Sequence, residues 1–246
     1  MISRETKLPP DAPAVSRQTR WAEDHYPDYL RDVDESIKFS GLDVDFFTAG
    51  KARWICRELL ALRSGSSRLR ALDIGCGIGT IHSYLIDAVD ELVGVDVSTD
   101  ALSVARERNP RAKYAHYDGQ RLPFSDGQFD VALTVCVLHH VAPSSWQSFL
   151  GEADRVLRPG GAMLVFEHNP WNPLTRIAVN RCTFDHDAVL LTARRVRELM
   201  TEIGFKEMRS RFIFFTPFRH AGAQWLDERL GFLPLGAQYY TFGVKP

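Results

Sequence analysis

The chain has 246 residues, of which 45% are hydrophobic and 25% are charged, and its formal net charge is −1. This composition is typical of a globular domain with a sizeable core, and the near-neutral charge gives no basic field that would hold nucleic acid. The four cysteines are far apart and form no C-x-x-C pair, which argues against a disulfide framework or a common zinc motif.

Residues 1–41 are predicted to form an arm and a cap. Residues 1–16 are polar and contain three prolines, which is typical of a loose arm. From Trp21 to Phe47 aromatic side chains alternate with acids. This pattern suits a helical cap over a pocket, although packing of the same side chains on the main core explains it equally well.

The main domain is predicted to span residues 42–246 and to begin with a helix over Asp43–Leu62, where apolar residues follow a helical repeat. Residues 64–67 are predicted to form the turn into the first strand.

The segment Ala71–Thr80 reads ALDIGCGIGT and predicts a buried strand that opens into a ligand-binding loop. The apolar run ends in Asp73, and glycines follow at Gly75, Gly77 and Gly79. Glycine permits positive φ and lets a ligand approach the main chain closely. The sequence therefore predicts a cofactor site in this loop.

Asp73 indicates which cofactor the loop binds. Dinucleotide-binding folds use G-x-G-x-x-G to hold a pyrophosphate, whereas here the third glycine comes one residue early and Thr80 takes its place. A negative Asp73 would repel a pyrophosphate and suits a ligand with an ammonium and a sulfonium, which is S-adenosylmethionine. The segment resembles the glycine-rich first motif of class I S-adenosylmethionine-dependent methyltransferases. A helix predicted over Ile81–Val89 would point its N-terminus at the same crevice.

A second buried strand is predicted over Leu92–Val97. Its Asp96 lies 21 residues after Gly75, close to the distance at which a second-strand carboxylate meets a ribose. The alternative is that Asp96 caps the next helix, predicted over Thr99–Asn109, but Ser98 or Thr99 can do this. We therefore expect Asp96 to accept hydrogen bonds from both ribose hydroxyls.

A third strand is predicted over Lys113–Tyr117 and is followed by Asp118 and Gly119. In the family that the chain resembles, an acid after this strand accepts a hydrogen bond from the adenine amino group, and Asp118 matches its position. The alternative is an ordinary Asp-Gly turn. The resemblance places four further cofactor-binding residues in the same loops: Cys76, Val97, Gly119 and Cys136.

The fourth strand is predicted within Phe129–Val141, and its apolar run fits a central strand that is buried on both faces. His139 and His140 follow it, where open α/β sheets place their chemistry. A helix over Ser145–Leu157 leads to the fifth strand, Ala162–Glu167. Motifs in this order, from residue 69 to residue 167, resemble the class I methyltransferase pattern.

Methyl transfer from a sulfonium is an in-line displacement, so a hydroxyl acceptor must lose its proton to a base. His140, ahead of His139, is the predicted base, with Glu167 as its orienting carboxylate. Similar paired histidines occur in sugar O-methyltransferases of this family. The alternative is that a histidine only hydrogen-bonds the loop that shapes the cofactor pocket. The weaker candidates are His168, His186 and Asp187, and because no ligand spacing links them we expect no metal.

Residues 170–190 are longer and more varied than a simple connection, which predicts a lid-like insertion over the strand ends. A helix over Thr192–Ile203 is predicted next, with Thr192 and Gly204 as its caps. Strands over Arg211–Phe215 and Gln238–Phe242, joined through a helix at residues 223–230, fit the closing antiparallel hairpin of the family.

Together these features predict an α/β fold, a doubly wound, Rossmann-like seven-stranded sheet. The resemblance implies the strand order 3-2-1-4-5-7-6 with strand 7 antiparallel, an N-terminal helical cap and a lid after strand 5. The predicted function is S-adenosylmethionine-dependent methylation of a small molecule, with a sugar or secondary-metabolite hydroxyl as acceptor and nitrogen or carbon as possible alternatives. The rivals are a nicotinamide-dependent oxidoreductase and a non-catalytic binding module with the same fold.

The expected partner is therefore a small-molecule acceptor, and we expect no nucleic acid and no membrane. No apolar run approaches the roughly 20 residues that span a bilayer, and the first residues lack the apolar core of a secretory signal. We expect a cytoplasmic monomer or homodimer.

Overall fold

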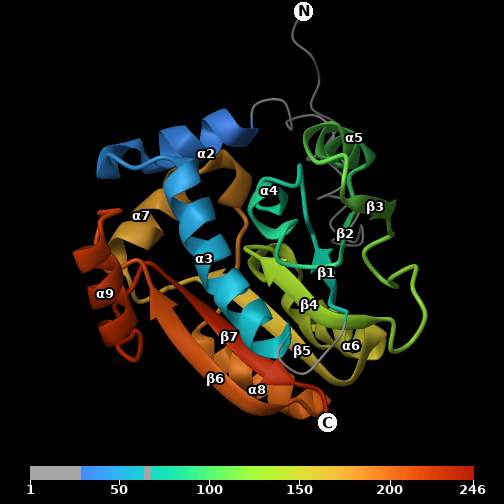
Figure 1. Cartoon of the computed structure of the whole chain (residues 1–246). Helices are drawn as coiled ribbons and strands as arrows, with labels where there is room; N and C mark the ends of the chain where they lie inside the picture. Colours follow the sequence, from blue (N-terminus) through green and yellow to red (C-terminus); the bar gives the residue numbers. More distant parts are fainter. Residues whose placement is uncertain (1–28, 64–67) are drawn as a thin grey trace, which may run out of the picture.

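The computed structural model of this chain describes residues 29–63 and 68–246. The predicted arm over residues 1–16, the first part of the aromatic segment and the turn over residues 64–67 lie outside the described residues. The described part contains a seven-stranded sheet with helices on both faces (Figure 1). The strands are β1 Arg70–Ile74, β2 Glu91–Asp96, β3 Lys113–His116, β4 Phe129–Val135, β5 Leu157–His168, β6 Lys206–Ile213 and β7 Gln238–Val244.

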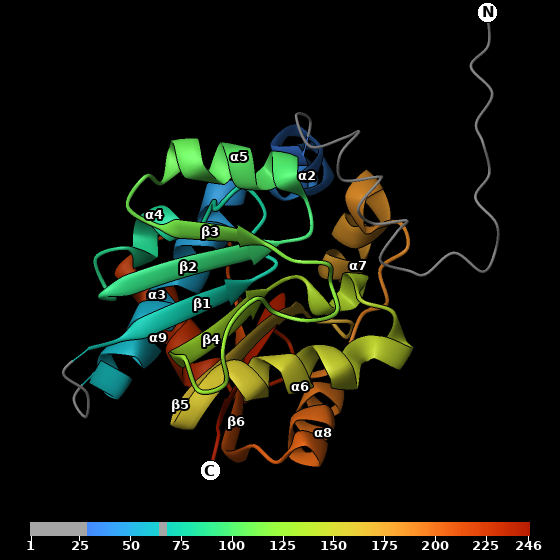
Figure 2. The ribbon, with the colours of Figure 1, turned by 90° about the vertical axis from the view of Figure 1, so that its right-hand side faces the viewer.

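The strand order is β3-β2-β1-β4-β5-β7-β6, which confirms the predicted topology. Strands β1 to β5 pair in parallel, whereas β7 runs antiparallel to both β5 and β6. Figure 2 shows the strands stepping down from β3 through β2, β1 and β4 to β5. The chain leaves β1 toward β2 and later returns on the other side to form β4. The point where the order reverses therefore lies between β1 and β4, and open sheets of this kind bind ligands there.

Eight α-helices are present in the described residues: α2 Tyr29–Ile37, α3 Val44–Arg63, α4 His82–Leu85, α5 Thr99–Arg108, α6 Trp146–Val156, α7 Pro173–Arg181, α8 Ala193–Ile203 and α9 Ala221–Leu230. Four short 3-10 helices are also present in the described residues: η2 Lys38–Ser40 after α2, η3 Leu138–His140 after β4, η4 Pro143–Ser145 before α6 and η5 Thr183–Asp185 after α7. The predicted helix caps of α8 are confirmed, because Thr192 accepts a hydrogen bond from the Arg195 amide and Gly204 ends the helix.

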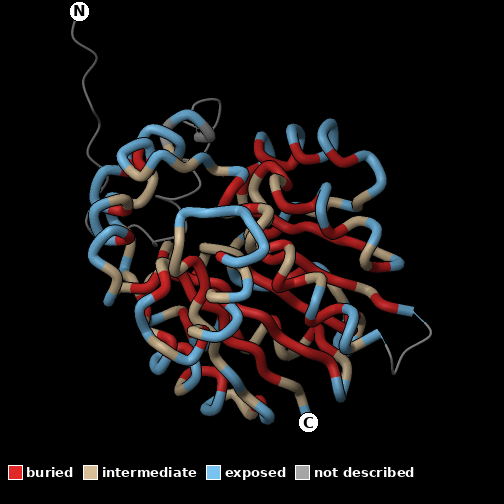
Figure 3. The backbone as a smooth tube through the Cα atoms, turned by 60° about the vertical axis from the view of Figure 1, so that its left-hand side comes forward, coloured by how far each residue is buried: buried red, intermediate tan, exposed pale blue. Residues whose placement is uncertain are grey.

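The alternation of side chains along each strand divides the core into two layers. In β1, Leu72 and Ile74 pack with α6 and α8, while Ala71 faces the opposite layer, which is formed with α3 and α4. The central strands are buried on both faces, as the red tube segments in Figure 3 show. This double burial explains why their sequences read as continuous apolar runs instead of alternating ones.

The helix after the glycine loop is shorter than predicted. The sequence suggested a helix over residues 81–89, but α4 covers only His82–Leu85. The chain turns away because the Asp90 amide donates to the Leu69 carbonyl at 2.9 Å, and the Asp90 carboxylate accepts from the Leu69 amide at 2.8 Å. These bonds fix the entry to β2 next to the entry to β1 and leave no length for further helical turns.

The sixth strand begins earlier and ends earlier than the predicted Arg211–Phe215. It starts at Lys206 directly after the Gly204 helix cap, and it contains a register shift between Lys206 and Arg209. Its end is set by Phe214, whose φ of 64° lies in the left-handed region. A non-glycine residue in this conformation turns the chain out of the sheet.

The cap consists of residues 29–40 and 170–189, which include α2, η2, α7 and η5. These elements contact one another although they are far apart in sequence, and Figure 1 shows α2 above α7 on one side of the molecule. The guanidinium of Arg181 lies 5.0 Å from the ring centre of Phe39, which joins the two parts. Both predicted cap segments, as far as they are described, therefore form one structure.

Within residues 29–63 and 68–246, no helix combines the length and the apolar character needed to cross a bilayer.

Replacing Leu59 by alanine should destabilise the fold, because the Leu59 side chain is fully buried between α3 and the sheet. We expect Leu59→Ala to lower the free energy of unfolding by about 2–5 kcal/mol in urea denaturation. The neighbouring Leu60 is 72% exposed. Leu60→Ala is therefore the matched control and should change stability by less than about 0.5 kcal/mol. Equal effects of the two substitutions would contradict the described packing of α3.

Candidate functional site

A cavity of about 1290 Å³ lies at the carboxyl ends of β1, β2, β4 and β5, beneath the cap. Pockets that hold one drug-sized ligand measure about 300–1000 Å³. The cavity therefore has room for a cofactor and a second molecule. Its walls combine the glycine loop, the end of β2, the residues that follow β4 and β5, and one side of the cap.

The glycine loop is held against β2 by its own backbone. The amides of Gly75 and Cys76 both donate to the Val95 carbonyl, at 2.8 and 2.9 Å. Gly75 has φ of 79°, and a Cβ built on it would lie 2.6 Å from a methyl carbon of Val137. A side chain at this position would collide with the segment after β4. The predicted need for glycine thus has a steric cause in the structure.

Gly77 and Gly79 also adopt positive φ, at 52° and 66°. A Cβ on Gly79 would lie 2.8 Å from the Asn109 amide nitrogen, and the Asn109 side chain donates to the Gly79 carbonyl at 3.0 Å. Gly77, Cys76 and Gly75 line the cavity, whereas Gly79 serves the turn behind it.

Asp73 is buried at the start of the loop, with its Oδ2 3.0 Å from His82 Nε2. His82 Nδ1 in turn lies 2.7 Å from the Tyr114 hydroxyl. Burial raises the pKa of Tyr114, so this hydroxyl keeps its proton. His82 Nε2–H donates to Asp73, which lines the cavity and whose Oδ1 is buried without a hydrogen-bond partner among the described residues.

Asp96 lines the cavity at the end of β2 with both oxygens held by backbone amides. Gly77 donates to Oδ2 at 2.8 Å and Ser98 donates to Oδ1 at 2.9 Å. Burial raises the pKa of Asp96, while the two amides oppose this effect. The helix that follows is capped by the Ser98 hydroxyl, which accepts from Ala101 at 3.2 Å. Asp96 is therefore not needed as a cap and can accept further hydrogen bonds from the cavity.

Asp118 is exposed and is not among the cavity-lining residues, although Gly119 and Gln120 beside it are. Its Oδ1 accepts from the amides of Arg121 and Gln120, at 3.0 and 2.8 Å, and these bonds lower the pKa of Asp118. This geometry is that of an Asp-Gly turn. The adenine contact predicted for Asp118 thus stays a prediction.

The chain leaves β4 through Cys136, a non-glycine residue with φ of 59°. Burial raises the pKa of the Cys136 thiol, and its Sγ lies 3.6 Å from Lys51 Nζ. Lys51 comes from α3 and lines the same cavity. Lys51 was not predicted, because nothing in the sequence pattern of α3 distinguishes a lysine that faces the cavity from one that faces solvent.

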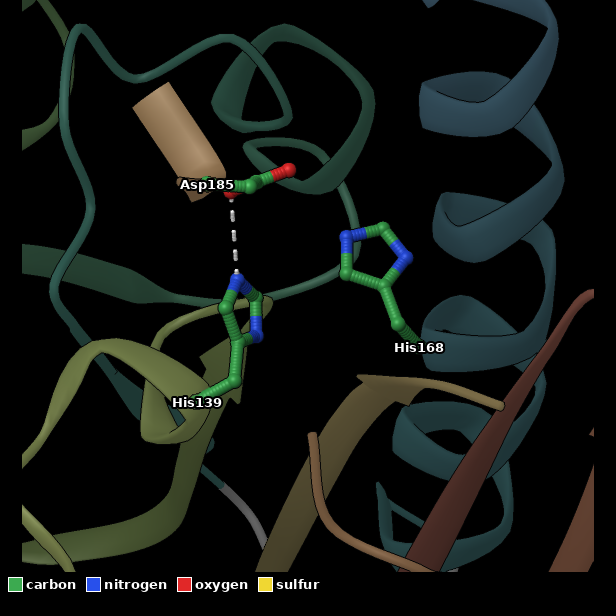
Figure 4. A group of neighbouring side chains, drawn as sticks. All are labelled: His139, His168 and Asp185. Carbon is green, nitrogen blue, oxygen red and sulfur yellow. Dashed lines mark ion pairs between the residues drawn. The ribbon is translucent and has the colours of Figure 1, made fainter. Parts of the chain in front are cut away.

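Glu167 is the predicted orienting carboxylate of the base, with His140 ahead of His139, and in the structure Glu167 contacts His139 while a third residue joins this pair. His139 Nδ1 lies 2.5 Å from Glu167 Oε2, and Glu167 Oε1 accepts from the Leu138 amide at 2.8 Å. On its other side, His139 Nε2 lies 3.5 Å from Asp185 Oδ1 (Figure 4). His139 is 1% exposed, so it sits between two carboxylates away from solvent.

This position decides the charge of His139. Burial alone would lower the pKa of His139, but Glu167 and Asp185 outweigh it and raise that pKa well above its usual value. The same contacts hold the pKa of Glu167 below its usual value against the effect of burial. His139 is therefore an imidazolium near neutral pH in the absence of other ligands, which makes it a poor proton acceptor.

His140 and His168 have lowered pKa values, in contrast to His139. Burial and the nearby charge of His139 lower the pKa of His140, and they lower the pKa of His168 to about 4. Both are neutral near pH 7 and both line the cavity. His140 Nε2 also lies 3.3 Å from Asp185 Oδ1.

Asp185 is the site residue that the sequence did not single out. It belongs to η5 in the cap, where His186 and Asp187 were the predicted candidates, but the side chains of those two are 76% and 64% exposed. The Val189 amide donates to the His139 carbonyl at 2.8 Å, which ties this part of the cap to the end of β4. Residues 185–187 read DHD, and this run of acids and histidine was the available signal for a site. Only the folded chain shows which of the two acids points inward.

The chain is similar in sequence to several proteins that are named as methyltransferases. A family profile described as a methyltransferase domain matches residues 72–165. A demethylmenaquinone methyltransferase of Beutenbergia cavernae is 32% identical over 142 residues, which cover 57% of this chain and 58% of that protein. A 27-O-demethylrifamycin SV methyltransferase of Amycolatopsis mediterranei is 36% identical over 112 residues, or 43% of this chain and 39% of the relative. The chain thus spans less than two thirds of the length of these curated relatives.

Among solved structures, a methyltransferase of Thermotoga maritima described as a possible histamine N-methyltransferase superposes with a TM-score of 0.64. It is 22% identical in sequence, and the match covers 93% of this chain and 100% of that one. Residues 72–165 thus match a methyltransferase domain, and the fold of the chain is that of solved S-adenosylmethionine-dependent methyltransferases.

The residues at this end of the cavity fit S-adenosylmethionine. The glycine loop forms a cradle that a Cβ at Gly75 would fill, and Asp96 offers a buried acceptor next to it. The unpartnered Asp73 Oδ1 gives the rim a negative charge that suits a cationic ligand.

The substitution Gly75→Ala should weaken cofactor binding. A positive φ and a clash with Val137 together introduce strain of about 1–3 kcal/mol, and relief of that strain would move the loop. We expect S-adenosylmethionine affinity, measured by calorimetry, to fall about tenfold or more. Gly151 lies in α6, and a Cβ added there would meet no heavy atom within 4 Å, so Gly151→Ala is the control. It should leave affinity unchanged and add about 1 kcal/mol of stability. Unchanged affinity of Gly75→Ala would contradict the assigned loop.

Proposed function

We propose that this chain transfers a methyl group from S-adenosylmethionine to a hydroxyl of a small-molecule secondary metabolite. The observation that carries the proposal is the cavity, which combines a glycine cradle, two carboxylates and a histidine cluster with room for a second molecule. Methylation of nitrogen or carbon is the alternative at the same site. The match of residues 72–165 to a methyltransferase domain supports methyl transfer over the nicotinamide chemistry that a different glycine loop would serve.

The cofactor end of the cavity is assigned to the carboxyl ends of β1 and β2. Asp96 would accept hydrogen bonds from the ribose hydroxyls, because each of its oxygens accepts only one backbone bond in the structure. Asp73 Oδ1 would accept from the ammonium group. We retain Asp118 as the predicted adenine contact, since Gly119 and Gln120 beside it line the cavity. When bound, S-adenosylmethionine supplies a methyl group that its sulfonium makes electrophilic.

The acceptor end is assigned to the space under the cap. Its lining there is mainly apolar, with Val33, Ile37, Phe39, Leu42, Phe46, Leu174 and Val179 among the residues. An apolar lining of this kind suits a bulky secondary metabolite better than a sugar, whose hydroxyls would need more polar partners. The name of the rifamycin relative describes an O-methylation, which supports oxygen as the acceptor atom.

His140 is assigned as the proton acceptor. Its lowered pKa keeps it neutral, and its contact with Asp185 lets Nε2–H donate to the carboxylate, which leaves the lone pair on Nδ1. His139 and Glu167 are positioning residues in this scheme, because His139 already carries its proton. The cap would exclude water from the reacting atoms, since residues of α2, α7 and η5 close the cavity over the histidines.

Binding of the cofactor tests the first part of the proposal. We expect calorimetry to show S-adenosylmethionine binding and Asp96→Asn to weaken it about 10- to 100-fold, because a buried charged acceptor for the ribose is lost. The matched control is Asp100→Asn, an exposed acid four residues further along the chain. Its affinity should equal that of the unaltered chain. Binding of NADH in place of S-adenosylmethionine would rule the proposal out.

The pH dependence of methyl transfer tests the role of His140. Because the pKa of His140 lies below its ordinary value of about 6.5, its basic form is complete at neutral pH. Activity should therefore be constant near pH 7 and decline only as the pH falls through that lowered pKa.

With a panel of hydroxylated acceptors, His140→Gln should lower kcat about 10²- to 10⁴-fold and remove the acid limb of the profile. His186→Gln alters an exposed histidine next to Asp185, and it should change neither kcat nor the acid limb of the profile. An unchanged acid limb in His140→Gln would exclude this base.

A further inference from the structure

Two histidines and one carboxylate from three separate segments meet at the edge of the cavity. His139 lies in η3, His168 ends β5 and Asp185 ends η5. One possible ligand atom from each lies within 4.8 Å of the other two, and Figure 4 shows the three side chains converging on one space. We propose that His139, His168 and Asp185 bind one divalent transition-metal ion, such as Zn²⁺ or Mn²⁺, at the acceptor end of the cavity.

His139 Nε2 is the strongest indication of a missing ligand. This atom is buried and has no hydrogen-bond partner among the described residues, although it lies 3.5 Å from Asp185 Oδ1. A buried unpaired polar atom costs free energy unless something binds to it. Two imidazoles and a carboxylate form a donor set that first-row divalent metals use when they keep open coordination positions.

The distances suit a site that closes slightly around its ion. Metal–ligand bonds of about 2.0–2.2 Å place neighbouring ligand atoms roughly 3–4 Å apart. The separation of 3.5 Å between His139 and Asp185 already falls in this range. The widest separation in the cluster, within 4.8 Å, requires a movement of about 1 Å. Asp185 lies in the cap, so a small shift of the cap is enough.

The surroundings of both histidines support their role as ligands. Glu167 lies 2.5 Å from His139 Nδ1, and metal-bound histidines usually donate their second ring N–H to such a carboxylate. Gln238 Nε2 lies 3.4 Å from His168 Nδ1, and Gln238 Oε1 is buried without a partner among the described residues. Rotation of this amide by about 180° would let Oε1 accept from Nδ1–H and free His168 Nε2 for the ion. In Figure 4, His168 turns a ring nitrogen toward Asp185.

The cluster contains two carboxylates that could offset the charge of an ion. Glu167 is fully buried and Asp185 is mostly buried, and in the absence of an ion a single imidazolium, His139, lies between these two carboxylates. A divalent ion bound to neutral His139 would balance both. Lys51 also lines this part of the cavity, and its ammonium contacts Cys136 at 3.6 Å.

All three ligands line the cavity next to His140, so an acceptor oxygen could occupy an open position on the ion. Coordination lowers the pKa of a hydroxyl and holds its oxygen in place. The ion would thus favour acceptors that carry a phenol, an enol or two oxygens on adjacent carbons. This role rests on the proposed function, whereas binding of the ion does not.

Metal titration of the full chain tests the inference. After chelator treatment and dialysis, Co²⁺ would be added as a spectroscopic probe and Zn²⁺ would be titrated by calorimetry. We expect one equivalent to bind with a dissociation constant in the micromolar range or below, with visible Co²⁺ absorption. His168→Gln and Asp185→Asn should each weaken binding at least about 100-fold. His186→Gln, which alters an exposed histidine next to Asp185, should bind as the unaltered chain does.

Absence of binding, or equal binding by His168→Gln and His186→Gln, would overturn the inference. Thermal unfolding of each variant identifies any that does not fold, and His168→Gln decides the outcome if Asp185→Asn is unstable. S-adenosylmethionine binding is measured on the same samples. A chain that binds this cofactor but no metal contradicts only the metal site, and a chain that binds metal but no cofactor contradicts only the proposed function.

Discussion

Hydrogen bonds to three buried carboxylates hold the carboxyl edge of the sheet together. Asp73, Asp96 and Glu167 lie at the ends of β1, β2 and β5, and each binds a group from another segment of the chain. A carboxylate loses its hydration when it is buried, so its position is stable only where donors replace that water. The donors here belong to the glycine loop, to α4 and to the segment after β4. The loops of the site are thus fixed by the same groups that give it its charge.

The fourth carboxylate of the site, Asp185, differs because it comes from the cap. It faces His139 and His140 at 3.5 and 3.3 Å, and the nearby Val189 amide donates to the His139 carbonyl. The raised pKa of His139 therefore depends on Glu167 of β5 together with Asp185 of the cap. His139 lies between two acids and keeps its proton. Burial and the positive charge of His139 lower the pKa of the neighbouring His140, which is therefore neutral.

Much of this could be predicted from the sequence, for physical reasons that differ between the elements. The strand order and the cofactor loop were predictable because glycines at fixed spacing and continuous apolar runs depend on local geometry. The position of Asp96 and the meeting of Glu167 with the histidines after β4 followed from the rule that parallel strands end at one edge, but which histidine Glu167 contacts did not. The short α4 was not predictable, because its length is set by contacts between Asp90 and Leu69.

Three site residues were not predicted for the same reason: His82, Lys51 and Asp185. Each reaches the site from an element whose local sequence pattern looks ordinary. The proposed metal ligands have no recognisable spacing because the strand ends and the cap bring them together only in three dimensions.

The location of Asp185 also affects the order of events in a turnover. If the cap opened, His139 and His140 would remain at the end of β4 but would lose their contacts with Asp185. For the proposed reaction, closing of the cap over an acceptor would then complete the polar cluster, and opening for product release would separate it again. An acceptor too small to contact the cap would leave the cluster incomplete.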